Sequence, residues 1–179
     1  MADLGDGLKL YEALELRSEL DARIQTIRDC LPEARKNRDR WLAPREEGNR
    51  RPSPDFDPAA ARDRLKRLEL RRRKLNAAIQ QANFQHRIEH DGERMTLSEA
   101  LEVRKGLNEA IGELHTQLVD SAWQRVIYKE DRDIVEETEL SYTECSKRLE
   151  KARLEFRALN RGLRAASFEV SVDFRDDQD

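Results

Sequence analysis

The chain has 179 residues, of which 40% are charged and only 6% are aromatic, and its mean hydropathy is −0.91. This composition is too polar for a thick globular core, but it suits long helices that bury a narrow apolar stripe. The net charge of −3 argues against general attraction of the whole chain to nucleic acid. No stretch is apolar enough for a signal peptide or a membrane span, so we expect a cytoplasmic protein with reduced Cys30 and Cys145.

Two segments of the chain occur twice. Residues 10–24 and 97–111 align at an offset of 87 with eight identical positions of fifteen, and residues 64–84 and 148–168 align at an offset of 84. Neither copy can bury its apolar seam alone. The sequence therefore predicts two helix–connector–helix copies, residues 1–90 and 91–179, packed about a pseudo-two-fold axis as one structural domain.

The predicted seams advance by three and four residues, which is the spacing of helices that cross at a shallow angle. The predicted fold is mainly α, with two pseudo-symmetric helical hairpins in a bundle or coiled-coil-like core. The first helix carries its seam at Leu10, Ala13, Arg17, Leu20, Ile24, Ile27 and Leu31, and its copy carries one at the positions 87 residues later.

Helix ends and connectors are also marked. Pro32 should end or kink the first helix, and Asp57 should cap a helix that begins at Pro58. Thr96 and Glu99 form a capping-box pattern. The connector 44–57 is expected to be an exposed loop, whereas the connector 123–142 predicts two short strands or an apolar flap.

The tails after the second helix of each copy alternate in polarity, as strands do. Their apolar positions predict a small ladder that joins the two halves. These positions are Phe84, His86 and Ile88 in one tail, and Phe168, Val170, Val172 and Phe174 in the other.

Several polar residues fall on or beside the apolar seams. One interpretation is that they set helix register and pairing; the other is a polar pocket that binds a small anion or carboxylate. An antiparallel arrangement of the two first helices would let Glu12 face Arg104 and Glu99 face Arg17. The full set is Glu12, Arg17, Arg72, Asn76, Glu99, Arg104 and Asn160.

A basic run with a local charge of +6 predicts a second kind of site. It could bind a phosphate backbone, although no aromatic residue is present in it to stack on bases. Alternatively, it is a solvated helix face that pairs with the acidic residues 129–139, whose local charge is −4. Its basic residues are Arg62, Arg64, Lys66, Arg67, Arg71, Arg72, Arg73 and Lys74.

The segment HRIEH, residues 86–90, matches the His-x-x-Glu-His pattern of some zinc peptidases. That pattern needs both histidines on one face of a helix, with a third ligand from elsewhere. Here the segment follows a helix end and runs into the turn residues Asp91-Gly92. In strand geometry His86 and His90 share a face and Glu89 points away, which favours a bare metal contact, if any, over hydrolysis.

A succession of residues runs from the end of one predicted helix into the start of the next. It comprises Ile79, Ala82, Asn83, Thr96, Leu97, Glu99, Ala100, Leu101, Arg104 and Leu107. This succession resembles the patterns INxTN and TLTEAL..R..L of the septicolysin-like family of small bacterial helical proteins, with Ala82 where that family has Thr, and the resemblance spans most of the chain. It implies a helical fold, but no settled activity and no accepted catalytic residues. The family's name suggests a cytolysin, yet no apolar stretch here would insert into a membrane.

Taken together, the sequence predicts a non-enzymatic helical module for assembly or protein interaction, without a cofactor. Long helices with narrow seams leave little core per chain, so we expect a homo-oligomer or a complex with another protein. Two alternatives remain: nucleic-acid binding through residues 62–74, and a metal-dependent hydrolase that uses His86, Glu89 and His90.

Overall fold

The computed structural model describes residues 7–32, 52–129, 132–136 and 140–175. The chain forms two compact units: unit 1 comprises residues 1–82 and 168–179, and unit 2 comprises residues 83–167. The predicted fold class, mainly helical with short β segments, is confirmed. The prediction of one structural domain over both copies stays a prediction.

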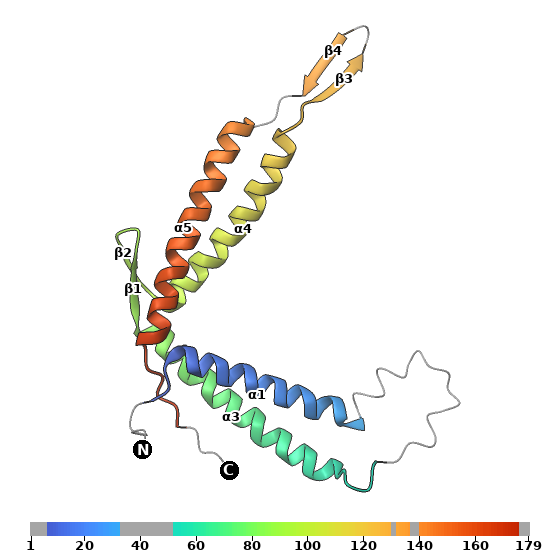
Figure 1. Ribbon diagram of the computed structural model, residues 1–179, viewed down its shortest axis with the longest axis vertical. Helices are drawn as coiled ribbons and strands as arrows, with labels where there is room; N and C mark the ends of the chain where they lie inside the picture. Colours follow the sequence, from blue (N-terminus) through green and yellow to red (C-terminus); the bar gives the residue numbers. More distant parts are fainter. Residues whose placement is uncertain (1–6, 33–51, 130–131, 137–139, 176–179) are drawn as a thin grey trace, which may run out of the picture. The chain divides into compact units, whose positions relative to one another are not determined.

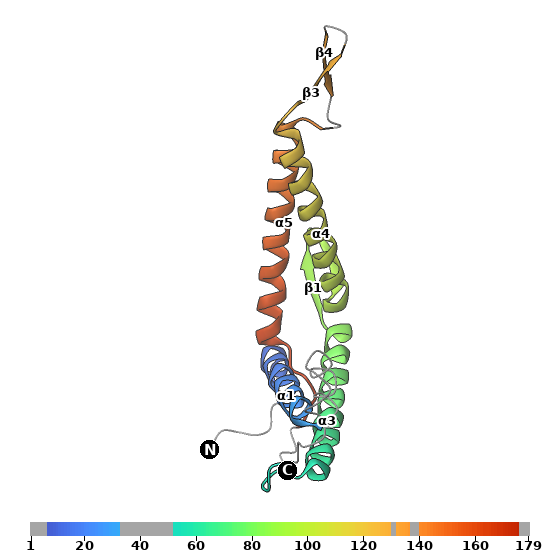
Figure 2. The same ribbon diagram turned by 90° about the vertical axis from the view of Figure 1, so that its right-hand side faces the viewer.

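Each unit is built on a pair of long helices that lie side by side (Figures 1 and 2). Unit 1 contains α1 (Leu10–Cys30) and α3 (Pro58–Gln85), and unit 2 contains α4 (Leu97–Ser121) and α5 (Tyr142–Glu169). Most of the connector that follows α1 lies outside the described residues, so the prediction of a loop over 44–57 is tested only from residue 52 onward.

The helix ends follow the sequence signals. Helix α1 ends at Cys30, directly before Leu31 and Pro32. Asp57 Oδ1 accepts from the Ala59 amide at 2.8 Å, which caps α3 where Pro58 begins it. These signals act locally, so they did not depend on any tertiary contact.

Two antiparallel β-hairpins complete the described fold, and both belong to unit 2. Strand β1 (Arg87–His90) pairs with β2 (Glu93–Thr96) across a tight turn, where Asp91 and Gly92 have φ of 52° and 77°. Two successive positive φ angles match the twist of a hairpin turn, which favours the pair Asp-Gly. Strands β3 (Arg125–Lys129) and β4 (Arg132–Glu136) form the second hairpin, in the connector where the sequence predicted two short strands.

The tail of each sequence copy pairs with the residues that lead into the first helix of the other copy. In unit 2 the Leu97 amide donates to the His86 carbonyl at 3.0 Å, and in unit 1 the Leu10 amide donates to the Val170 carbonyl at 2.8 Å. The two donors are equivalent at the offset of 87, and the two acceptors are equivalent at the offset of 84. The same hydrogen bond therefore occurs once in each unit. The predicted small ladder between the two halves is present as β1–β2, and the equivalent contact in unit 1 is an isolated bridge between Lys9 and Ser171.

The tail strand of unit 1 lies very close to the start of the chain. A Cβ atom added to Gly7 would lie 2.6 Å from the Val172 carbonyl oxygen, which no side chain could accept without a shift. The Val172 amide donates to the Leu8 carbonyl at 2.7 Å, and the Val172 side chain is fully buried. A residue without a side chain at position 7 therefore allows the tail to close over the base of the hairpin.

The core of each unit is the seam between its two helices. The equivalent residues Leu75 and Leu159 are both fully buried, as are Ala13 and Ala100. Away from the base the two units differ: Leu20 is buried in α1, whereas its counterpart Leu107 is only half-buried in α4. In unit 2 the strand residues Ile88 and Met95 add to the core at the base of the hairpin.

Candidate interaction surface

The polar seam residues of unit 1 are paired across the two helices, but they are not buried. An Arg17 guanidinium nitrogen donates to Asn76 Oδ1 at 3.5 Å, and Arg72 Nε donates to Asp21 Oδ1 at 2.9 Å. Across the described residues, no polar or charged residue is buried. Arg17 and Arg72 are half-buried and bridge the two helices at the edges of the apolar seam. Their role in helix register and pairing stays a prediction.

Unit 2 does not repeat this polar pair. Arg104 is exposed and Asn160 is half-buried, and in the described part of the chain no hydrogen bond joins them. The two residues recur in the sequence, but only the first copy uses the pair as a link between helices. The predicted polar pocket on the two-fold axis stays a prediction.

Glu12 and Glu99 cap their own helices. The Glu99 carboxylate accepts from the Thr96 amide at 2.7 Å and from the Thr96 hydroxyl at 2.9 Å, and these two bonds hold the pKa of Glu99 below its ordinary value. Thr96 Oγ1 in turn accepts from the Glu99 amide at 3.1 Å. Glu12 accepts from the Lys9 amide at 2.7 Å, but the lysine side chain has no acceptor to complete the box. Both carboxylates thus have a local structural role.

The basic run lies on α3, and part of its charge is used within unit 1. Arg72 pairs with Asp21, Lys66 Nζ lies 3.5 Å from Asp63 Oδ1, and Glu69 accepts from Arg28 of α1 at 2.6 Å. The predicted pairing with the acidic residues 129–139 falls largely outside the described side chains.

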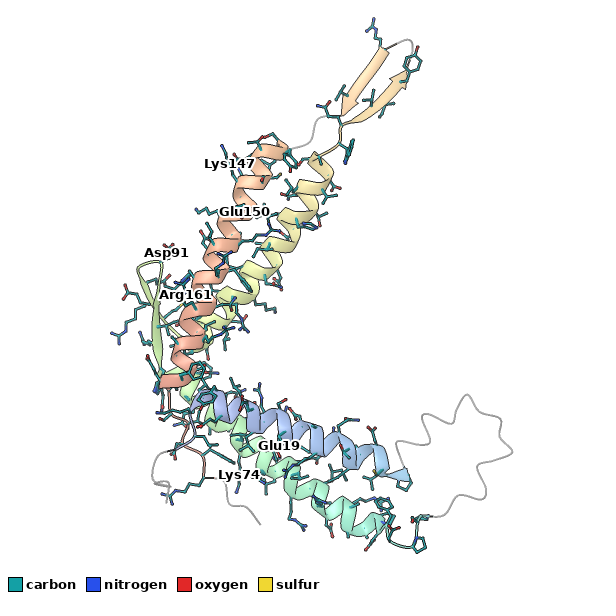
Figure 3. The ribbon with its side chains drawn as sticks, viewed as in Figure 1. Glu19, Lys74, Asp91, Lys147, Glu150 and Arg161 are labelled. Carbon is teal, nitrogen blue, oxygen red and sulfur yellow. The ribbon has the colours of Figure 1, made fainter. Side chains whose placement is uncertain are left out.

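Other basic residues of the run form a row on one side of α3. Arg64, Arg67, Arg71 and Lys74 are spaced by three, four and three residues, which aligns them along a helix. Arg71 is half-buried and the other three are exposed. Figure 3 labels Lys74 on α3 and Glu19 on the neighbouring α1.

The histidine pattern lies at strand β1 rather than on a helix. His86, Ile88 and His90 are half-buried, and the alternate residues Arg87 and Glu89 are exposed. Glu89 therefore points away from the histidines, and the helical zinc-peptidase arrangement is wrong for this segment. Over the residues that the structure describes, no group of three or more His, Cys, Asp and Glu residues could hold a metal ion.

A cluster of exposed apolar side chains lies at the far end of unit 2, where β3 and β4 project beyond α4 and α5 (Figures 1 and 2). The Trp123 side chain is 84% exposed and Tyr128 is 71% exposed. We name this set the hairpin cluster. It comprises Val119, Trp123, Val126, Ile127, Tyr128, Val135 and Tyr142.

The hairpin cluster was not among the candidate site residues from the sequence. The signal was present, since the apolar runs around Ile127 and Ile134 predicted an apolar flap. It was missed as a site because sequence alone does not show whether a short apolar strand is covered by another element.

The second helix of each unit also carries one exposed leucine at an equivalent position. Leu70 on α3 and Leu154 on α5 correspond at the offset of 84, and their side chains are 45% and 58% exposed. Each falls between the seam positions of its helix. Single exposed leucines are common, but recurrence at equivalent positions places the same apolar contact point on both units.

The chain matches no protein-family model, and no curated protein matches it. It is similar in structure to a functionally unknown conserved protein from Corynebacterium diphtheriae. The TM-score is 0.65 and the identity is 22%, and the alignment covers 94% of this chain and 100% of that chain. A likeness at this identity establishes the fold alone. The resemblance to the septicolysin-like family stays a prediction.

None of the described helices could span a membrane. Each of them carries too many charged residues, or too few apolar ones, over the length that crossing a bilayer needs.

Proposed function

We propose that this protein is a non-enzymatic assembly module that associates with further copies of itself. The observation that carries the proposal is the hairpin cluster, because seven large apolar side chains at one end of unit 2 are exposed. A group of exposed large apolar side chains at one end of a unit is typical of protein interaction sites. The exposed leucines Leu70 and Leu154 add apolar contact points on the helices.

The charges of the helices support association between copies. In α1 and α4 acidic residues outnumber basic residues, by five to three and by five to two. In α3 and α5 the balance is reversed, with eight basic to two acidic and seven basic to four acidic. Each hairpin unit thus offers an acidic and a basic helix, so that two copies can meet with opposite charges facing each other.

Size-exclusion chromatography with light scattering tests the proposal on the untagged protein. We expect a discrete oligomer whose mass holds over a tenfold dilution, with the absorbance spectrum of protein alone. A monomer at every concentration up to about 100 µM would contradict self-association.

Nucleic-acid binding is the second candidate, and the row of Arg64, Arg67 and Lys74 on α3 favours it. Exposed basic side chains along one helix can follow a phosphate backbone. Under this alternative the purified protein would carry nucleic acid that is released by high salt.

A charge-reversed variant separates the two candidates. The triple change R64E/R67E/K74E should abolish retention on heparin if α3 binds phosphates. The control R157E/R161E/R164E makes the same change of charge on exposed residues of α5. Equal loss of retention in both variants would show that only net charge matters, and would count against a site on α3.

A further inference from the structure

The two β-hairpins of unit 2 differ in how they are covered. On β1–β2, Met95 is buried and Ile88 packs against the core residues Ala100 and Leu159. On β3–β4, the apolar residues Val126, Ile127 and Val135 are all exposed. An isolated two-stranded hairpin is at best marginally stable in water, and three or more strands are usually needed. Within the described residues, Val126, Ile127 and Val135 thus stay exposed on a hairpin that needs further strands for independent stability.

A strand edge is the natural place for a further strand to pair. Each outer edge of a two-stranded ladder presents unpaired amide and carbonyl groups, which are ready to bond with another strand. The hairpin offers two such edges, one along β3 and one along β4. Their sequences decide which edge could pair with the same edge of a second copy.

The charges at the strand ends exclude β3 and favour β4. Strand β3, RVIYK, is basic at both ends, so any pairing with another β3 places like charges opposite each other. Strand β4, RDIVE, is basic at Arg132 and acidic at Glu136. In an antiparallel pair of two β4 strands centred on Ile134, position 132 of each copy lies opposite position 136 of the other. Both end pairs then join opposite charges.

We propose that two copies of this protein pair through the β4 edges of their hairpins, antiparallel about Ile134, to form a four-stranded sheet β3-β4-β4-β3. The inference rests on the proposed self-association and specifies its surface. The sheet brings together the exposed apolar residues of both hairpins, and it has the strand number that an independent sheet needs. The basic β3 edges remain outermost, where they prevent further strand addition.

Two single charge reversals and their mixture test this pairing. R132E makes both ends of β4 acidic, and E136R makes both ends basic. Either variant alone should raise the dimer Kd by about tenfold, because two attractive cross-strand pairs become repulsive. An equimolar mixture should restore wild-type affinity, since each acidic strand then faces a basic one. Sedimentation measures the Kd, and native mass spectrometry identifies the mixed dimer.

The register within one chain separates this effect from stability of the hairpin. Lys129 is the partner of Arg132, so R132E should improve the hairpin while it weakens the dimer. Arg125 is the partner of Glu136, so E136R should weaken both. Matched controls are R94E and E89R in the β1–β2 hairpin, where both residues are exposed; these should leave the dimer unchanged.

The outcomes distinguish this inference from the proposed function. If the wild type is oligomeric and neither variant changes its mass, the β4 pairing is wrong while self-association stands. If both variants dissociate but their equimolar mixture does not form a dimer with wild-type affinity, the antiparallel register is wrong. A wild type that is always monomeric would overturn self-association and the β4 pairing together. A monomer that captures an unrelated strand would likewise overturn the choice of a second copy as the partner.

Discussion

Unit 1 and unit 2 begin from the same sequence repeat, yet they bury it to different depths. In α1 the seam is buried at Leu20 and Ile24, whereas the corresponding Leu107 and Ile111 of α4 are half-buried. Unit 1 adds three pairs between its helices, namely Arg17–Asn76, Arg72–Asp21 and Arg28–Glu69. The duplicated apolar positions therefore determine where the helices meet. How much of that seam is buried from solvent depends on the polar contacts beside it and on the other segments that pack over it.

The second difference lies in the connectors. The β3–β4 hairpin of unit 2 exposes the hairpin cluster, and residues 52–57 of unit 1 lead into α3 through an ordinary cap at Asp57. Because the helices repeat and the connectors do not, the connectors are where one copy could acquire a function that the other lacks.

The largest expected effect follows from the difference in burial. Leu20→Ala should destabilise unit 1 by about 2–5 kcal/mol, because it opens a cavity in a closed seam. Leu107→Ala should cost unit 2 only about 1–2 kcal/mol, because that side chain is already partly in water. Native-state hydrogen exchange measures the free energy of opening of α1 and of α4 separately. As a control, Leu10→Ala and Leu97→Ala should cost similar amounts, since both side chains are buried. Equal losses at positions 20 and 107 would contradict the comparison.

An intermediate effect concerns the helix starts. The bonds from Thr96 lower the pKa of Glu99 in the folded protein below its ordinary value of 4.5. The stability that Glu99 contributes is therefore present above about pH 4.5, and it is lost as the pH falls through the lowered pKa of the folded state. Hydrogen-exchange protection in the first turn of α4 should therefore fall on acidification. Glu99→Gln should remove that pH dependence, because the amide does not titrate. Unchanged acid sensitivity in this variant would assign the effect to other carboxylates.

The smallest expected effect follows from removal of the Arg72–Asp21 ion pair, which has no counterpart at the equivalent positions of unit 2. Arg72 and Asp21 side chains are 42% and 48% exposed, and such pairs contribute about 0.2–1 kcal/mol. The corresponding residues of unit 2 are Phe156 and Asn108. A double-mutant cycle of R72A and D21A by urea unfolding measures the coupling, which should shrink in high salt. A coupling energy above about 2 kcal/mol would mean that the ion pair is shielded from water more than the exposed fractions of its side chains indicate.

Much of the fold could be predicted because its signals are local or repeated. Pro32, Asp57 and Thr96 mark helix boundaries through bonds within a few residues, and the Asp91-Gly92 turn follows from backbone preference alone. Repetition at the offsets of 87 and 84 then predicted paired helical hairpins, and the alternating polarity of the tails predicted a small ladder between the halves.

The candidate site was less predictable, because it depends on which surfaces remain uncovered. The sequence placed Arg17 and Arg104 at equivalent seam positions, but only Arg17 meets an asparagine partner across the helices. Apolar strands at β1 and β3 also look alike in sequence, since both are short and flanked by charge. One packs on a helix pair and the other does not, and this depends on where the neighbouring helices end.

By itself, the sequence determined the helices, their caps, the duplication and the position of the short strands. Tertiary structure alone decided that the tail of each copy closes the base of the other's hairpin, and that the β3–β4 apolar residues stay exposed. The physical reason is that hydrogen bonds and dihedral preferences act over a few residues, whereas burial depends on chain segments that lie far apart in sequence.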